Sequence, residues 1–325
     1  VVVKDQLSLL DAMFHNFDNS GYFSGKPVEQ LDCLNESANF VLATEKSKHF
    51  FMDVVKRLKS AYDICVGSDE LTQLHKDKIH YYLAVRTLIF KITSGNAPDV
   101  EQMNEKVRDL VKDALQSDGV EEIFKLGAEH GHEISIFDDD YLAKIENIKQ
   151  PNTKMELLQQ LLKKAIGEFK KTNKVKSIDF SKKMNAIVQK YNERDETTTM
   201  NAKVMKEFTD QIIDIIYQMR EEVNSYQGMG IDYEEKAFYD ILKLVSKKYD
   251  FEYPEDKMIE LSKRIKVIVD DKAHYTDWST REDIKANLQV DLILLMDEFD
   301  YPPVTIDDVY KEVLEQAENF KKYAR

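Results

Sequence analysis

The segment Leu292 to Glu298 is an apolar run that ends in two carboxylates, the residue order of the element that holds magnesium and activates water in ATPases. Such an element needs a partner loop, whose glycines let backbone amides surround phosphate and which ends in Lys and then Ser or Thr. In the nearest candidate, Gly21 to Lys26, the glycines are one residue too close, and Pro27 stands where the magnesium-binding hydroxyl belongs. The sequence therefore predicts no ATP site in this chain.

Two further groups of polar residues partly match metal sites. The segment Asn16 to Gly21 begins like a calcium-binding loop, but its first ligand is not Asp and Pro27 replaces the bidentate glutamate. His130 and His132 could supply two metal ligands, yet the helix-spaced pair of a zinc hydrolase is missing, so we interpret them as surface residues. The seven histidines form no arrangement with Ser and Asp. The sequence therefore predicts no catalytic residue, no metal and no cofactor in this chain.

The chemistry that the sequence does suggest is electrostatic. Residues 151 to 190 contain ten lysines and three acidic residues, a net charge of +7, whereas the whole chain has a net charge of −14. The candidate contact residues in this segment are Lys163, Lys164, Lys170, Lys171, Lys174 and Lys176. They could neutralise the phosphates of DNA, which would give salt-dependent binding, or they could form a solvated or partner-facing side of a helix. No aromatic stacking residue interleaves with them, so we favour the second interpretation.

Helical periodicity dominates the elements that would position these residues. Apolar residues recur at steps of three and four over 51–65, 155–169 and 204–223, which predicts helices there. Only 10 Gly and 6 Pro, against 33% charged residues, favour long helices over a turn-rich β architecture. We expect an all-α fold, an irregular bundle of roughly a dozen helices, because breaker residues divide the chain into that many segments. No repeat of fixed period is present, so a regular solenoid is not expected.

The chain length and the positions of the glycines limit the domain organisations that are possible. A chain of 325 residues with 42% hydrophobic residues can bury a substantial core. That core can form one large domain or two helical lobes, residues 1–130 and 131–325, with a hinge at 228–230. Cys33 and Cys65 make neither a disulfide framework nor a metal-ligand spacing. No apolar run is long enough to cross a bilayer, so we expect a cytoplasmic protein without membrane contact.

One helix is strongly predicted in the C-terminal region. Ser279 and Glu282 have the spacing of a capping box, so the helix should begin there. Its apolar face consists of Ile284, Leu288, Leu292, Leu295 and Phe299. The residues that widen this face are Val290, Ile293, Leu294 and Met296. Their presence predicts that the end of the helix is enclosed.

The residues that flank this helix are candidate docking or core anchors. They are Trp278 before the helix and Tyr301, Pro302 and Pro303 after it. The prolines should end the helix, because proline cannot donate a backbone hydrogen bond and constrains the residue before it. Trp278 is the only tryptophan of the chain. It could be a core anchor or an interface hot spot, and we favour the core, because large aromatic side chains are highly buried on average.

These flanking residues also carry a family resemblance. The segment from Asp277-Trp278-Ser279 to Tyr301-Pro302-Pro303 resembles the C-terminal helical region of the R (motor and endonuclease) subunit of type I restriction enzymes, with Ser279 in place of the usual threonine. Further segments that are similar to this family are Ala237–Leu242, Phe180–Arg194, Ile134–Ile148 and Val54–Asp63. These five segments follow the family's order and are distributed over nearly the whole chain.

The resemblance implies an assembly role. In the family, the nuclease and two helicase-like domains lie upstream of this region, and ATP and magnesium would bind there. The domain itself would attach the R subunit to the methyltransferase (M) and specificity (S) subunits. The start at Val1, without an initiator methionine, agrees with a fragment. The match of Glu234 to Lys236 to the family's nuclease motif opens a helical pattern instead of a strand, so we interpret it as chance.

Two alternatives from other classes stay open. The chain could be a nucleic-acid-binding element that guides duplex DNA past the motor, which the basic segment favours and the overall negative charge opposes. It could also be an unrelated helical scaffold.

Overall fold

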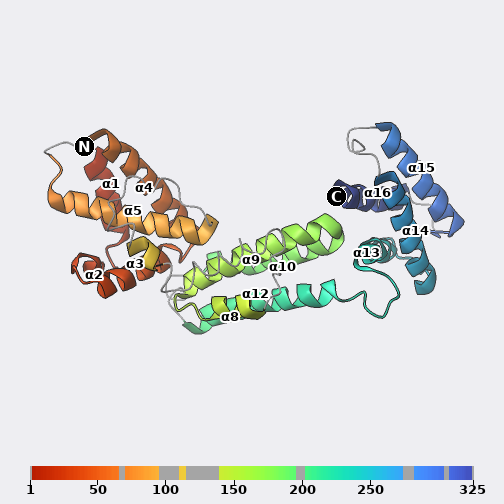
Figure 1. Cartoon of the computed structure of the whole chain (residues 1–325), viewed down its shortest axis with the longest axis horizontal. Helices are drawn as coiled ribbons and strands as arrows, with labels where there is room; N and C mark the ends of the chain where they lie inside the picture. The colour runs from red at the N-terminus through yellow and green to blue at the C-terminus, as the bar shows by residue number, and fades with distance from the viewer. Residues whose placement is uncertain are drawn as a thin grey trace. The chain divides into compact units, whose positions relative to one another are not determined.

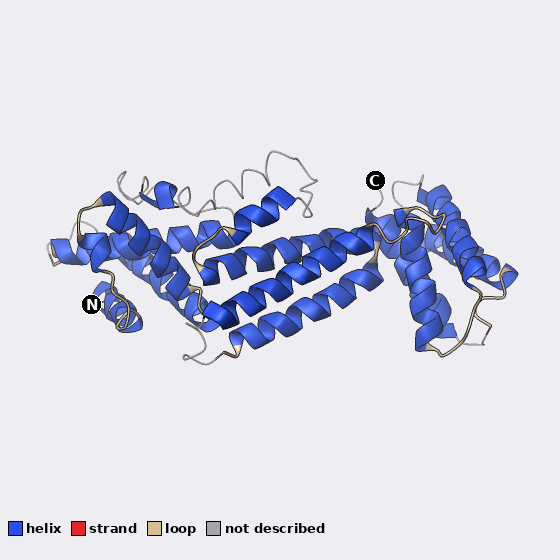
Figure 2. Ribbon diagram, turned by 90° about the horizontal axis from the view of Figure 1, so that it is seen from below, coloured by secondary structure: helices blue, strands red, loops and turns tan. Residues whose placement is uncertain are grey.

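The computed structural model describes residues 2–65, 70–94, 110–114, 139–194, 202–273, 282–303 and 307–323. All regular secondary structure in these ranges is helical, without a strand (Figure 2). The predicted all-α class is therefore confirmed. Within the same ranges, no helix is both long enough and apolar enough to span a bilayer.

The helices follow one another along the chain as the breaker residues suggested (Figure 1). Their bounds are α1 (Val2–Met13), α2 (Ser20–Phe23), α3 (Pro27–Val41), α4 (Glu45–Cys65), α5 (Gln73–Ser94), α8 (Asp139–Glu146), α9 (Pro151–Thr172), α10 (Lys174–Asn192), α12 (Ala202–Val223), α13 (Tyr233–Lys248), α14 (Glu255–Ala273), α15 (Glu282–Glu298) and α16 (Asp307–Tyr323). The three helices that periodicity predicts over 51–65, 155–169 and 204–223 are α4, α9 and α12.

The chain divides into two compact units. Unit 1 consists of Val1–Leu161 and Ile187–Ile213, and unit 2 consists of Leu162–Ala186 and Asp214–Arg325. The helices α9, α10 and α12 contribute residues to both units. The predicted boundary between residues 130 and 131 lies outside the described residues and stays a prediction. At the predicted hinge, Gly228 and Gly230 have positive φ angles of 85° and 71°, a conformation that favours glycine.

An aromatic cluster forms the core of unit 1. The ring of Phe14, which follows α1, lies within 6.0 Å, centroid to centroid, of five other rings. These rings belong to Phe17, Phe40, Phe51, Tyr81 and Tyr82 and come from α3, α4 and α5 as well as from the turn after α1. Because aromatic pairs in tilted and edge-to-face arrangements add to burial energy, this cluster holds the four segments together.

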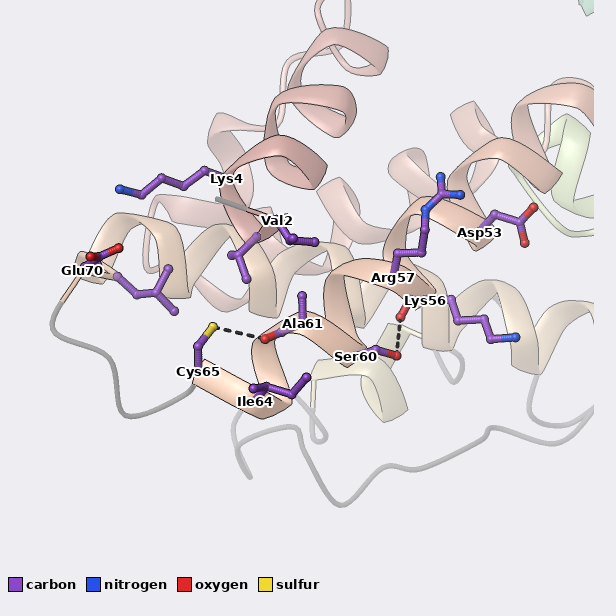
Figure 3. Close-up of a pocket in the computed structure, with 12 residues that line it drawn as sticks. Val2, Lys4, Asp53, Lys56, Arg57, Ser60, Ala61, Ile64, Cys65 and Glu70 are labelled. Carbon is purple, nitrogen blue, oxygen red and sulfur yellow. Dashed lines mark hydrogen bonds between the residues drawn. The ribbon is translucent and has the colours of Figure 1, made fainter.

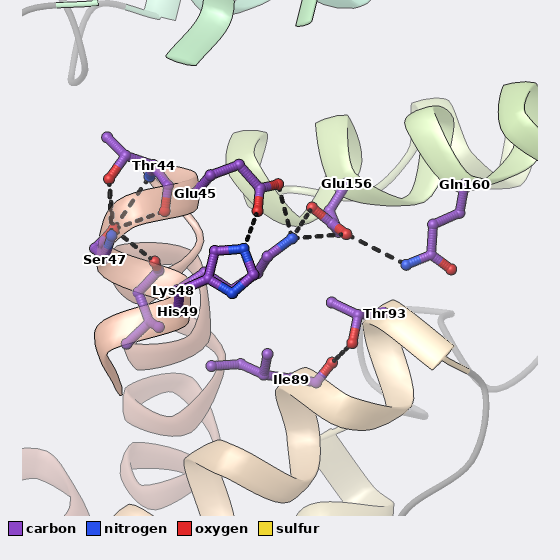
Figure 4. A network of polar contacts seen from close by, with 10 residues as sticks. Thr44, Glu45, Ser47, Lys48, His49, Ile89, Thr93, Glu156 and Gln160 are labelled. Atoms are coloured by element: carbon purple, nitrogen blue, oxygen red, sulfur yellow. Dashed lines mark hydrogen bonds and ion pairs between the residues drawn. The ribbon is translucent and has the colours of Figure 1, made fainter. Parts of the chain in front are cut away.

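A partly buried ion-pair network joins α4 to α9 within unit 1 (Figure 4). The Lys48 ammonium lies 2.8 Å from the carboxylate of Glu45 and 3.1 Å from that of Glu156. Burial opposes the charge of Lys48, but the two carboxylates outweigh it and raise the pKa of Lys48. Lys48 is therefore a structural cation rather than a general base.

Two helices of unit 2 end in the same way, with an aspartate in the left-handed conformation. Asp250 after α13 and Asp300 after α15 both have φ of 53°. The next N–H in each case, that of Phe251 or Tyr301, donates to the carbonyl of Ser246 or Met296 at 3.0 Å and 2.8 Å. This is the six-to-one bond of a Schellman ending, in which glycine is the usual left-handed residue.

Replacing Asp300 with glycine is expected to stabilise the protein by about 1 kcal/mol, because glycine accepts positive φ without strain and the change removes a negative charge from the negative end of α15. Thermal unfolding of the 325-residue chain measures the effect as a rise in Tm. Asp5→Gly, on the exposed face of the first turn of α1, is the control and should lower Tm. A fall in Tm for Asp300→Gly would contradict the assignment of strain to this residue.

Candidate functional site

The six predicted contact lysines lie on α9 and at the start of α10, in unit 2. Three of them pair with carboxylates of the fold. The Nζ to carboxylate distances are 2.6 Å for Lys171 with Glu168, 2.7 Å for Lys174 with Glu315 and 3.0 Å for Lys176 with Glu222. Lys163, Lys164 and Lys170 are exposed, and no carboxylate among the described residues lies within ion-pair distance of them. The structure thus separates a paired group of lysines from an unpaired one.

Tyr301 is a core residue of unit 2. Its side chain is 1% exposed, and its hydroxyl donates to the carbonyl of Leu242 at 2.7 Å. The rings of Phe251 and Tyr253 pack edge-on against it, with centroid distances of 5.5 Å and 4.9 Å. Its hydrogen bond and ring contacts therefore connect the ends of α13 and α15.

The other flanking candidates differ from Tyr301. Pro302, joined to Tyr301 by a cis peptide bond, is half-buried, and Pro303 is exposed. Trp278 lies outside the described residues, and so does Ser279 of the predicted capping box, so their roles stay predictions. His130 and His132 also lie outside the described residues.

A buried ionic network, which sequence reasoning missed, lies where α10, α12 and α13 meet. The Lys236 ammonium lies 2.5 Å from the carboxylate of Asp240 and 3.2 Å from that of Glu222. Glu222 also pairs with Lys176, and Asp240 accepts a hydrogen bond of 2.7 Å from the side-chain amide of Asn173. The signal in the sequence was the spacing of four between Lys236 and Asp240, which places both on one helix face.

Local sequence explains the position of Lys236. The Asp232 side chain accepts from the backbone N–H groups of Glu234 and Glu235, while the Glu235 carboxylate accepts from the Asp232 N–H, so a capping box starts α13. Lys236 then lies one turn into the helix and is 6% exposed, as is Asp240. A charge removed from water to this extent requires a partner at hydrogen-bonding distance.

Burial raises the pKa of Asp240, although Lys236 lowers it in part. Burial also raises the pKa of Glu222, but its hydrogen bonds and charge interactions with Lys176 and Lys236 outweigh this effect and lower it overall. The network is thus a compensated structural feature, with two ammonium groups for two carboxylates. It gives no nucleophile and no open metal position.

The residues of the nuclease-like sequence Glu234 to Lys236 contact different partners and do not converge on one site. The Glu234 carboxylate lies 3.1 Å from the ammonium of Lys266 on α14, while Lys236 belongs to the buried network. Across the described part of the chain, no three His, Cys, Asp or Glu side chains gather as a metal site would require. In the calcium-like segment, the Asp18 carboxylate accepts from the backbone N–H of Ser20 at 2.9 Å and so belongs to a local turn.

The helix α15 corrects one prediction. Its end was expected to be enclosed, but Val290, Ile293 and Leu294 are 53%, 36% and 62% exposed. The opposite face, which packs on the core of unit 2, consists of Leu288, Leu292, Leu295 and Met296. The spacing of three and four between the exposed residues places them in one stripe, which we call the α15 stripe. The prediction was wrong because α15 is apolar on two faces, and the described residues cover only one of them.

Negative charge surrounds the end of the α15 stripe. Asp297 and Glu298 lie in the last turn of α15, and Asp300 follows it. The last turn contains no basic residue, although cations are the residues that stabilise a helix C-terminus. From α14, a guanidinium nitrogen of Arg264 lies 3.9 Å from the Glu298 carboxylate.

A groove of about 760 Å³ in unit 1 is mainly apolar (Figure 3). Val2, Ala61, Ile64 and Leu71 contribute to its lining. The Cys65 thiol in this lining donates to the carbonyl of Ala61 at 3.1 Å. It is thus bonded to the backbone of its own helix, and the groove offers no nucleophile paired with a base.

Comparison with known proteins covers nearly the whole chain. Residues 1–323 match the family "Type I restriction enzyme HindI endonuclease subunit-like, C-terminal". The "Putative type I restriction enzyme MjaIXP endonuclease subunit" of Methanocaldococcus jannaschii is 21% identical over 330 residues, which cover 98% of this chain and 30% of that protein. The "Type I restriction enzyme HindI endonuclease subunit" of Haemophilus influenzae is 23% identical over 276 residues, which cover 85% of this chain and 25% of that protein.

The chain therefore spans less than a third of the length of these two relatives. No solved structure gives a significant match. The match to the family extends from the first residue through α16 and so includes both units. The resemblance inferred from the sequence is confirmed, and the chain belongs to the C-terminal family of type I restriction enzyme endonuclease subunits.

Proposed function

We propose that this chain is a non-catalytic assembly domain, which docks an ATP-dependent DNA translocase and endonuclease onto the M and S subunits of a type I restriction enzyme. In this role it contributes to the restriction of foreign DNA. ATP and magnesium would be bound by other domains of the parent subunit. The partners of the domain are the M and S subunits and the upstream domains of its own subunit.

The α15 stripe is the observation that supports docking. A residue as apolar as leucine contributes to stability when it leaves water, yet Leu294 and Val290 are more than half exposed. Apolar side chains grouped in one stripe and bordered by charge are typical of a protein interface with an apolar centre and a polar rim. The acidic residues around the stripe favour a partner surface that has apolar side chains with lysines or arginines beside them.

The test is a triple substitution, Val290→Ser, Ile293→Ser and Leu294→Ser, in the 325-residue chain. Isothermal titration into the purified M and S complex should show saturable binding for the unaltered chain and at least tenfold weaker binding for the variant. The reason is that the variant removes the apolar centre of the interface, where binding energy concentrates. Because the three side chains are exposed, the unfolding midpoint should change little.

The matched control is Val28→Ser with Leu74→Ser. Both side chains are at least 62% exposed, and both lie on helices of unit 1, α3 and α5. This control should bind as the unaltered chain does. Equal binding by the α15 variant and the unaltered chain would exclude the stripe as the docking surface, and no binding by the unaltered chain would exclude the proposed function.

A further inference from the structure

The second feature of unit 2 that the fold leaves unexplained is a glycine in the middle of α9. Gly167 is exposed, and a Cβ atom built on it would meet no described atom within 4 Å. Close packing within the described part of the chain therefore does not explain the glycine. A mid-helix glycine destabilises a helix relative to alanine, because it loses more backbone freedom on folding.

Four lysines surround this glycine. They are Lys163 and Lys164 on one side along the helix and Lys170 and Lys171 on the other, at the spacings minus four, minus three, plus three and plus four. In an α-helix, residues at these four spacings are the surface neighbours of the central position, with Cβ atoms about 5–6 Å apart. The result is a shallow notch without a side chain, bordered by four lysines, of which Lys163, Lys164 and Lys170 are unpaired among the described residues and Lys171 pairs with the Glu168 carboxylate at 2.6 Å. We call it the Gly167 notch.

The packing of the rest of α9 keeps the notch on the solvent-exposed side of the helix. Ala165, Ile166 and Phe169 are buried on the opposite face. The end of the helix is attached to α16, because the side chains of Asn319 and Gln316 donate to the carbonyls of Lys170 and Thr172, both at 2.8 Å. These bonds use the backbone of Lys170 and leave its side chain exposed. The notch is therefore carried by a packed and anchored helix.

We propose that the Gly167 notch binds the phosphodiester backbone of duplex nucleic acid without reading its sequence. Lysine ammonium groups neutralise phosphates and release condensed counterions. The absent side chain lets a phosphate approach the helix surface closely, which explains why glycine is used at this position. Lys163 and Lys170 are separated by about 10 Å along the helix, which corresponds to about three phosphates along one strand.

The composition of the notch favours a duplex over other polyanions. Single-stranded nucleic acid is bound through aromatic side chains on which bases stack, but Phe169, the aromatic residue between these lysines, is buried. An acidic peptide would also need apolar or hydrogen-bonding contacts for its side chains, and the notch offers lysines around a bare backbone. The overall charge of −14 does not cancel this local charge, because salt screens exposed charges beyond about 8 Å.

The test compares the salt dependence of DNA binding. Fluorescence anisotropy of a labelled 20-base-pair duplex is measured with the 325-residue chain and with the triple variant Lys163→Gln, Lys164→Gln and Lys170→Gln, from low to physiological salt. The logarithm of the affinity should fall less steeply with the logarithm of salt in the variant, by about 0.9 for each lysine lost. The control Lys56→Gln, Lys247→Gln and Lys257→Gln removes the same charge from exposed lysines elsewhere and should keep the original slope.

A third variant, Gly167→Gln, tests the notch separately from its charge. Glutamine is a better helix former than glycine, so the variant should unfold at a higher urea concentration and yet bind the duplex several-fold more weakly. The proposal is overturned if the chain does not bind the duplex, if the control loses as much slope as the triple variant, or if labelled polyglutamate binds and the duplex does not. Docking to the M and S complex should be unaffected in all three variants, so a failure of the DNA-binding proposal can be distinguished from a failure of the docking proposal.

Discussion

Replacing Asp240 with alanine is expected to destabilise the chain by about 3–5 kcal/mol, the usual cost of removing one partner of a buried ion pair. The Lys236 ammonium would lose the carboxylate at 2.5 Å and keep only Glu222 at 3.2 Å, in a place where water reaches little of it. Asn173 would lose the acceptor of its side-chain amide as well. Urea unfolding followed by circular dichroism measures the loss as a lower midpoint.

Two further variants distinguish the effect of breaking the buried ion pair from the effect of losing side-chain packing. The exposed pair Lys206 and Asp210, at 2.8 Å on α12, is the control, and Asp210→Ala should lower the urea midpoint much less, because water and salt screen an exposed pair. The double variant Lys236→Met with Asp240→Leu removes both charges and should recover a large part of the stability, because buried pairs can be replaced by apolar residues. If Asp240→Ala and Asp210→Ala had equal effects, the buried network would have no structural role.

Replacing Tyr301 with alanine is expected to cost about 3–5 kcal/mol, as for other large buried aromatic side chains. The substitution removes a ring that contacts Phe251 and Tyr253 and leaves a cavity where α13 and α15 end. Tyr301→Phe keeps the ring and removes the hydroxyl that donates to the Leu242 carbonyl, so it should cost only about 1 kcal/mol. Thermal unfolding of both variants gives the two values.

The matched control for Tyr301 is Tyr217→Ala on α12. Tyr217 is 43% exposed, so its loss should cost much less than that of Tyr301. If Tyr301→Phe were as damaging as Tyr301→Ala, the hydrogen bond to Leu242 would dominate over ring packing. A Tyr301→Ala variant that unfolds as the original chain does would show that the ends of α13 and α15 do not depend on this side chain.

The helical class and the main helices could be predicted from the sequence, because the evidence for them is local. Apolar residues at steps of three and four, as in 204–223, indicate which side of a helix faces a core, whichever elements form that core. The two helix endings at Asp250 and Asp300 share the local sequence aromatic-Asp-aromatic, so they could also have been predicted from the sequence. Family membership also follows from sequence alone, since five short segments in order were enough to indicate it.

The tertiary structure decided which apolar helix faces are buried and which are exposed. Periodicity shows that Val290 and Leu294 are apolar, but whether another element covers them depends on residues far away in the chain, and the described part of unit 2 covers only the opposite face. Likewise, the six lysines of the basic segment look alike in the sequence. Two of them, Lys174 and Lys176, become ion-paired because folding brings Glu315 and Glu222 beside α10. Lys171 instead pairs with Glu168, three residues before it on α9.

The sequence by itself therefore determined what this protein is built from, an all-α member of a restriction-enzyme subunit family with a basic segment and a helix that ends before Tyr301. The tertiary structure decided which charges are compensated, as in the network of Lys236, and which, among the described residues, are free to act, as at Lys163, Lys164 and Lys170. It also decided which apolar residues remain for a partner. The physical reason is the separation along the chain of the residues involved. Helix formation depends on neighbours within about four residues, whereas burial and long-range ion pairing depend on contacts across the fold.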